Sequence, residues 1–156
     1  MQDESARPRT LVLPPAPFAA ALTGGWWLDR TQWPLPLPDH PLAYWLGWGL
    51  TGAGLVLSIW TVATLWRHHT TVNPFRGVAT LCTDGPFQFS RNPIYLGDWL
   101  ILAGLSLVLA TYWPLLFSPL IWLLLRYGVI RHEEAHLTLR FGDAYRRYQA
   151  RTRRWI

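Results

Sequence analysis

The sequence predicts an all-α protein, a polytopic membrane helical bundle of about four transmembrane helices with an interfacial amphipathic helix at its C-terminal end. Of the 156 residues, 51% are hydrophobic and 15% are charged, whereas about 25% are charged in typical soluble proteins. Residues 11–28, 41–66 and 99–125 carry no charge at all. All 14 basic residues are Arg, and half of them follow residue 130. Uncharged apolar runs of this length are typical of membrane spans.

Each expected span has its own justification. Residues 11–28 and 42–66 are uncharged apolar runs, and the second is long enough to cross a bilayer with some tilt. The proline-rich stretch between them is incompatible with regular helix. As one helix, the apolar block after it would measure about 57 Å, nearly twice the hydrocarbon thickness. Two further spans are therefore expected, 94–111 and 114–130, joined near residues 112–114.

The remaining segment, 131–156, is strongly amphipathic. Its apolar residues recur at spacings of three and four on one helical face: Leu137, Phe141, Tyr145 and Tyr148. This pattern predicts a helix that lies along the membrane surface. The whole chain, 1–156, then forms a single integral membrane domain. The Arg excess in 67–92 and in the tail predicts that both termini are cytoplasmic, at a prokaryotic inner membrane.

Composition also excludes several classes of protein. The single cysteine, Cys82, leaves no internal disulfide framework and no zinc cluster built from cysteines. Arg residues beside membrane spans indicate a lipid bilayer as the partner, and no nucleic acid partner is expected. The N-terminal segment has acidic residues before its Arg and does not have the pattern of a cleaved signal peptide. The sequence does not fix an oligomeric state.

Two polar segments are expected to meet on the cytoplasmic side. The first is GPFQFSRNPIYLG, residues 85–97, and the second is RHEEAHL, residues 131–137. The predicted helical hairpin between them returns the chain to the same face of the membrane. Each charged residue alone is equally compatible with a headgroup anchor or a solvated helix face. Their joint appearance at both ends of one hairpin favours a functional site.

The pattern GPF-x-FSRNP-x-YLG, then a hydrophobic hairpin, then EE-x-x-L-x-x-x-FG-x-x-Y-x-x-Y resembles the isoprenylcysteine carboxyl methyltransferase family. The wider group of that family includes phospholipid methyltransferases. The resemblance covers roughly Thr70 to the C-terminus. It implies an integral membrane enzyme that uses S-adenosyl-L-methionine as its cofactor. The implied acceptor is a small or lipid-like molecule with either a carboxylate or an amine as the methylated group.

The resemblance also assigns roles to individual residues. It places seven residues at the cofactor: Arg91, Asn92, Pro93, Tyr95, Gly97, Glu133 and Glu134. It implies that Arg151 is catalytic and orients the substrate carboxylate. Either glutamate suits the cofactor's ammonium group, Arg91 its carboxylate and Tyr95 its sulfonium. Two departures stand out, because Asn92 replaces the family's usual His, and Thr152-Arg153 replace its Val-Pro.

Two alternative functions remain open from the sequence. His132-Glu133-Glu134-Ala135-His136 matches the H-E-x-x-H pattern of membrane zinc metalloproteases, in which both His residues bind zinc. Such a site needs a third protein ligand, and Asp143 is the sole acid after His136. The methyltransferase pattern explains the same glutamates with more of the chain, so no metal site is expected. A non-catalytic protein or a reductase on a similar scaffold is the other alternative.

Overall fold

The computed structural model describes residues 15–31, 33–38, 40–68 and 80–156. Within these ranges the chain is helical apart from its connections, and the single extended pairing is a bridge between Pro36 and Thr111. The all-α prediction is therefore confirmed. Residues 11–14, the beginning of the first expected span, lie outside the described residues.

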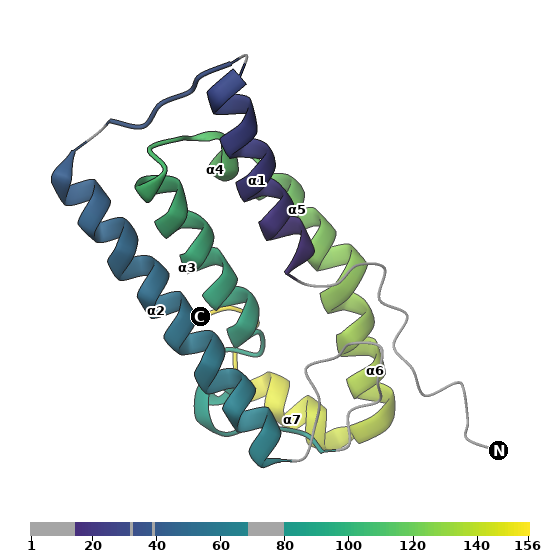
Figure 1. The fold of residues 1–156 in the computed structure, drawn as a ribbon. Coiled ribbons are helices and arrows are strands. Elements are labelled where there is room, and N and C mark those ends of the chain that lie inside the picture. Colours follow the sequence, from purple (N-terminus) through teal and green to yellow (C-terminus); the bar gives the residue numbers. More distant parts are fainter. Residues whose placement is uncertain (1–14, 32, 39, 69–79) are drawn as a thin grey trace.

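Most of the helices run up and down along one common direction (Figure 1). Pro114 and Pro119 each stand in the first turn of a helix, where a missing N–H costs nothing. The predicted junction near residues 112–114 is confirmed, because the chain turns between Val108 and Trp113. The main helices are α1 (Ala16–Thr31), α2 (Pro41–Arg67), α3 (Pro93–Val108), α4 (Trp113–Leu116) and α5 (Ser118–Leu125).

Among the described helices, α2 alone is long and apolar enough to cross a membrane, judged by length and composition. In its 18-residue window only 22% of the residues are buried within the protein, which is unlike the core helix of a soluble protein. The helices α1 and α3 have 16 residues each. Helix lengths alone therefore support one crossing helix, and not the four that the sequence predicts.

Two pairs of glycines bring α2 and α3 into close contact. A Cβ on Gly54 would lie 2.6 Å from the Gly97 carbonyl oxygen, and a Cβ on Gly47 would lie 2.7 Å from that of Gly104. The two pairs are seven residues apart in each helix, so the antiparallel helices approach on one face. We call these four residues the glycine interface. Side chains smaller than a methyl group are needed there, as in many membrane helix pairs.

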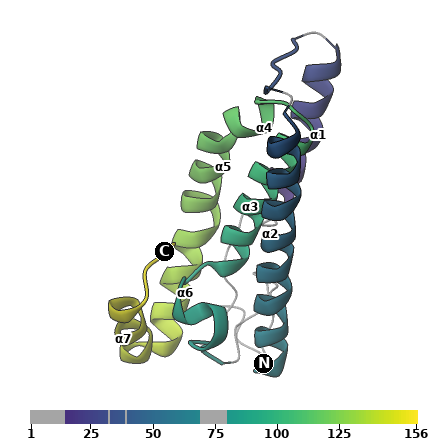
Figure 2. The same cartoon turned by 90° about the vertical axis from the view of Figure 1, so that its left-hand side faces the viewer.

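The tail differs from the predicted single surface helix. The fourth helix does not end at residue 130, because α5 continues through a π-helical turn, η3 (Arg126–Ile130), into α6 (Arg131–Phe141). Gly142 then adopts a φ of +50°, a conformation that favours glycine, and ends α6. The chain turns there into α7 (Asp143–Arg151). The apolar spacing therefore belongs to two helices, which pack in different directions (Figure 2).

A buried apolar core joins the remaining helices. It contains Phe18 from α1, Leu102 from α3 and Leu125 from α5, each less than 5% exposed. At the end of α1, the Asp29 carboxylate accepts hydrogen bonds from the Leu35 amide and the Thr111 hydroxyl. These contacts fix the connection between α1 and α2 against the α3–α4 turn. The opposite end of the bundle carries the two polar motif segments (Figure 1).

Candidate active site

The two polar segments that the sequence places on one side do meet. The first segment comprises the 3₁₀ turn η2 (Gly85–Gln88) and the first turn of α3, and the second is the first turn of α6. Arg91 Nη1 lies 3.0 Å from Glu134 Oε1. Figures 1 and 2 show the beginning of α3, α6 and α7 gathered at the end of the bundle where α2 ends. The predicted proximity of the motifs is therefore confirmed.

Glu134 is the centre of a charged cluster. Its carboxylate accepts two hydrogen bonds from Arg154, at 2.9 Å from Nε and 2.7 Å from Nη2. Arg91 approaches the same carboxylate from the other motif. The side chains of Arg91 and Glu134 are 13% and 17% exposed, and that of Arg154 is 35% exposed. A bidentate pair of this kind fixes geometry as well as charge. We call these three residues the Glu134 cluster.

The segment after α7 runs back along the first motif. The Asn92 side-chain amide donates a 2.9 Å hydrogen bond to the Arg154 carbonyl, and the Ser90 hydroxyl donates to the same oxygen at 3.3 Å. The Arg91 amide donates to the Arg153 carbonyl at 3.0 Å. Asn92 is thus a buried donor that anchors the tail. A non-titrating amide suits that structural contact, whatever else it binds.

Glu133 lies next to this cluster in a different environment. Burial, and to a smaller extent the neighbouring Glu134 charge, raises the pKa of Glu133 from 4.5 to about 7. Within the described residues no ion pair engages its carboxylate. Tyr145 of α7 is 2% exposed. Burial and the charges of both glutamates raise the pKa of Tyr145, and Arg91 opposes this shift. The first turn of α6 therefore holds one fully paired carboxylate and one that is costly to ionise.

The other predicted cofactor residues occupy the first turns of α3. Pro93 is buried and begins the helix, and Tyr95 is 7% exposed within the apolar core. Gly97 has a packing role. A side chain there would collide with the Ser58 hydroxyl and the Gly54 carbonyl of α2. Helix packing therefore requires a glycine at this position, and the cofactor contact expected for it stays a prediction.

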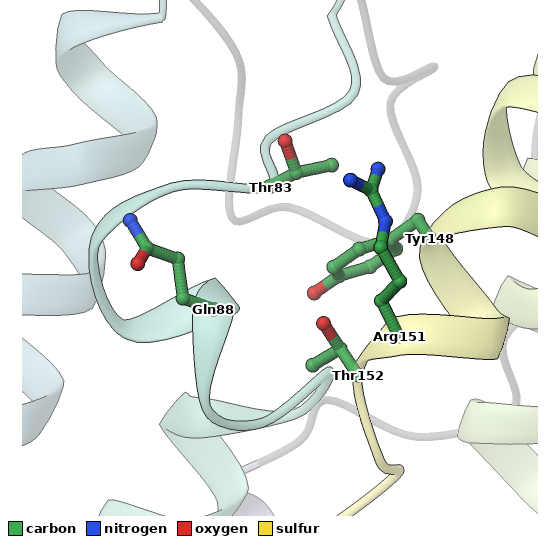
Figure 3. Close-up of a pocket in the computed structure, with 5 residues that line it drawn as sticks. All are labelled: Thr83, Gln88, Tyr148, Arg151 and Thr152. Atoms are coloured by element: carbon green, nitrogen blue, oxygen red, sulfur yellow. The ribbon is translucent and has the colours of Figure 1, made fainter.

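Arg151 lies apart from the Glu134 cluster, at a pocket between η2 and α7. The pocket has a volume of about 320 Å³, within the range of small-molecule sites. Figure 3 shows its five lining residues, Thr83, Gln88, Tyr148, Arg151 and Thr152. The Tyr148 hydroxyl donates to the Phe87 carbonyl at 2.7 Å, so α7 is fixed to η2 beside the pocket. Arg151 is exposed and supplies the cationic group.

In the described residues, the two His residues of the zinc alternative have no third protein ligand. No group of three or more His, Cys, Asp or Glu residues in the described part of the chain is arranged to hold a metal. His132 is exposed, whereas His136 is partly buried, and burial together with the Arg140 charge lowers its pKa. Asp143 follows the turn at Gly142 and pairs with Arg146 at 3.3 Å. The geometry therefore does not favour a metalloprotease.

Sequence reasoning missed the residues that join the two motifs. Arg154 is one of the Arg residues whose position beside membrane spans indicates a bilayer contact, but it binds Glu134. Ser90 and Tyr148 also bridge the segments through hydrogen bonds. No local pattern distinguishes Arg154 from the other tail arginines. The second Tyr of the motif was a weak signal, because its spacing from Tyr145 places both rings on one side of α7.

Fold and site together define a helical protein with an apolar hairpin and a charged site at one end. The family model for phospholipid methyltransferases matches residues 42–144, which include both motif segments. The chain belongs to the phospholipid methyltransferase family.

Two curated relatives match parts of the chain. The Protein-S-isoprenylcysteine O-methyltransferase of Schizosaccharomyces pombe is 34% identical over 70 residues, 44% of this chain and 29% of that protein. The Tryptophan permease of Saccharomyces cerevisiae is 25% identical over 108 residues, 67% of this chain and 18% of the permease. This chain thus aligns with less than a third of the length of either relative. No solved structure matches.

Proposed function

We propose that the protein is an integral membrane methyltransferase that uses S-adenosyl-L-methionine to methylate a small or lipid-like acceptor. The observation that carries the proposal is the Glu134 cluster, in which Arg91 and Glu134 from the two motif segments meet at 3.0 Å. Membership of the phospholipid methyltransferase family supports methyl transfer as the reaction. The partial relative from Schizosaccharomyces pombe has the same class of activity in its name.

The chemistry of these residues fits the proposed cofactor. Arg91 Nη1 faces Glu134 at 3.0 Å, whereas its buried Nε lacks a hydrogen-bond partner in the described residues, and a guanidinium group of this kind suits a carboxylate. Glu133 and Glu134 offer carboxylates for an ammonium group, and the Tyr95 ring offers a face for a sulfonium. Asn92 and Pro93 fix the backbone that presents Arg91. When bound, S-adenosyl-L-methionine supplies a methyl group on a sulfonium cation.

The protein's own contribution is to position the acceptor and exclude water, since methyl transfer is an in-line displacement. We propose that Arg151 orients an anionic part of the acceptor in the pocket between η2 and α7. A carboxylate acceptor is ionised at pH 7 and needs no general base, whereas an amine must first lose its proton. Arg151 Nε donates a 3.4 Å hydrogen bond to the Arg147 carbonyl, and no ion pair in the described part of the chain engages its Nη groups, which leaves them for a ligand.

The exposed surface of α2 supports acceptor entry from a bilayer. Large apolar side chains cover the face of α2 opposite the glycine interface, including Trp45, Val56 and Ile59, each at least 66% exposed. An apolar patch of this size suits lipid better than water. We propose a single domain, 1–156, with four spans, because α3 packs on α2, and α1 and α5–η3 run alongside on the other side of α3 (Figure 1). The Arg-rich end then lies in the cytoplasm, with both termini, at a prokaryotic inner membrane.

The test is a binding titration of S-adenosylhomocysteine with the full chain in detergent or nanodiscs. We expect saturable binding that Arg91→Leu weakens at least about tenfold, because charge-assisted hydrogen bonds to the ligand carboxylate are lost. Arg147→Leu is the matched control, since Arg147 is exposed on α7, and it should bind like the unaltered protein. Absence of binding by the unaltered protein, with binding of a nicotinamide nucleotide instead, would replace this proposal by a reductase.

A further inference from the structure

The Glu134 carboxylate is occupied by two guanidinium groups. Arg154 binds it through two hydrogen bonds of 2.9 and 2.7 Å, and Arg91 lies 3.0 Å from Oε1. One negative charge thus faces two positive charges in a site where the glutamate is 17% exposed. An ammonium group arriving at Glu134 would meet net positive charge. Glu134 is therefore poorly suited to bind a further cation.

The main chain of Arg154, as well as its side chain, is held in place. Its carbonyl accepts hydrogen bonds from Asn92 and Ser90, and the preceding carbonyl, of Arg153, accepts one from the Arg91 amide. The main chain at Arg154 is thus fixed to the first motif, while its guanidinium is fixed to the second. Asn92, which stands in place of the family's usual His, makes one of the main-chain contacts. This combination makes Arg154 a bridge between the two motifs.

We infer that Arg154 is a positioning residue that reserves Glu134 for the two arginines and leaves Glu133 as the carboxylate for the cofactor's ammonium group. The inference rests on the proposed function and names the partner of each acidic residue in the same site. Glu133 is the adjacent residue on α6, it is half-buried, and no ion pair engages it within the described residues. A cation there would meet an unpaired carboxylate.

The surroundings of Glu133 give this assignment a measurable signature. The titratable groups that act on or beside it are Glu134 on its own helix, Tyr95 on α3 and Tyr145 on α7. Burial and the Glu134 charge raise the pKa of Glu133 to about 7. Loss of Arg154 would leave the Glu134 charge less compensated, so the pKa of Glu133 would rise further. Binding of an ammonium group requires the ionised form.

The experiment measures S-adenosylhomocysteine affinity between pH 5.5 and 8 for the full chain and its variants. In the unaltered protein, affinity should increase as pH rises through about 7 and then level off, following the ionisation of Glu133. Glu133→Gln should bind at least about tenfold more weakly at pH 8, with a flat profile. Arg154→Gln should shift the midpoint of the profile upward, and Arg147→Gln should leave it unchanged.

Arg154→Lys guards against a folding defect in Arg154→Gln, because lysine keeps the charge but not the bidentate geometry. Its midpoint should lie between those of the unaltered protein and Arg154→Gln. If Glu133→Gln keeps full affinity and its profile while Glu134→Gln loses binding, the assignment of the glutamates is overturned and the proposed function stands. If a folded Arg154→Gln keeps the original midpoint, the positioning role is overturned. If the unaltered protein does not bind the probe, the proposed function fails together with this inference.

Discussion

The glycine interface and the Glu134 cluster both hold the first motif segment, residues 85–97, in place, but by opposite means. At the glycine interface, α2 and α3 are in backbone contact and no charge is present, so shape alone decides the fit. In the cluster, three charged side chains and two main-chain carbonyls join segments that are between 20 and 64 residues apart in sequence. The comparison shows a site in which close helix packing positions α3, whereas ion pairs align the first motif segment with α6 and the tail. Binding groups on rigid elements are positioned more accurately than groups on loops.

The largest expected effect concerns how Glu133 changes the stability of the protein with pH. Glu133 has a pKa of 4.5 in an ordinary environment and about 7 in the folded protein. Below pH 4.5 Glu133 is protonated in both states. Between pH 4.5 and about 7 the unfolded chain is ionised at Glu133 while the folded protein keeps the proton, so the free energy of unfolding falls across this window and levels off above pH 7. Glu133→Gln should therefore be more stable than the unaltered protein at pH 8, by at most about 3 kcal/mol, and equally stable near pH 4.

Thermal unfolding of the cofactor-free protein in detergent, followed by intrinsic tryptophan fluorescence at several pH values, measures this difference. Glu134→Gln serves as the comparison, because it removes the paired carboxylate and should destabilise at neutral pH. A stability difference for Glu133→Gln that is constant from pH 4 to 8 would contradict the buried position of this carboxylate.

The next effect tests the glycine interface through volume. A Cβ on Gly104 would lie 2.5 Å from the Gly47 carbonyl oxygen and 2.7 Å from the Thr51 amide nitrogen, both of which are backbone atoms that cannot yield cheaply. Gly104→Ala should therefore destabilise by about 1–3 kcal/mol, with no dependence on pH.

Gly49→Ala is the matched control in α2, since nothing lies within 4 Å of a Cβ at Gly49. It should be neutral or stabilising by about 0.5–1 kcal/mol, because alanine favours helix more than glycine does. Unfolding in mixed micelles of increasing denaturing detergent gives both values. Equal effects of the two substitutions would show that α2 and α3 are not in backbone contact.

The smallest expected effect tests the hydrogen bond that fixes α7 to η2. The Tyr148 hydroxyl donates to the Phe87 carbonyl at 2.7 Å, and burial raises the pKa of this tyrosine, so it remains a donor at neutral pH. Tyr148→Phe should cost about 1 kcal/mol by leaving that carbonyl unpaired. Tyr127→Phe, at an exposed tyrosine, is the control and should change nothing. The unfolding temperature of the two variants, measured side by side, decides between these outcomes.

Much of this architecture could be predicted from local sequence patterns. The uncharged run at 42–66 corresponds closely to α2, and the junction before Pro114 corresponds to the turn between α3 and α4. The continuation of the fourth helix past residue 130 was missed, because the return of charge at Arg131 is not itself a helix stop. Polarity ends a membrane segment, whereas a helix ends where its backbone conformation changes, as it does at Gly142.

The sequence predicted which segments of the candidate site lie close together, but not all of the hydrogen bonds and ion pairs that join them. Arg91 and Glu134 come together because the chain between them crosses the bundle twice, once in α3 and back again in α5 and η3. The contribution of Arg154 was not predictable, because a bidentate contact between residues twenty positions apart leaves no periodic trace. The packing role of Gly97 was not predictable for a related reason. A glycine in a ligand motif and a glycine in a helix interface look the same until the opposing backbone is known.

The return of residues 152–154 to the beginning of α3 has a consequence for biosynthesis. These residues leave the ribosome after every helix described above, yet they supply the carbonyls and the guanidinium that join the motifs. The helices can therefore pack before the Glu134 cluster exists. A nascent chain halted near Arg151 would hold its helices but would lack the guanidinium and the carbonyls that join the two motifs.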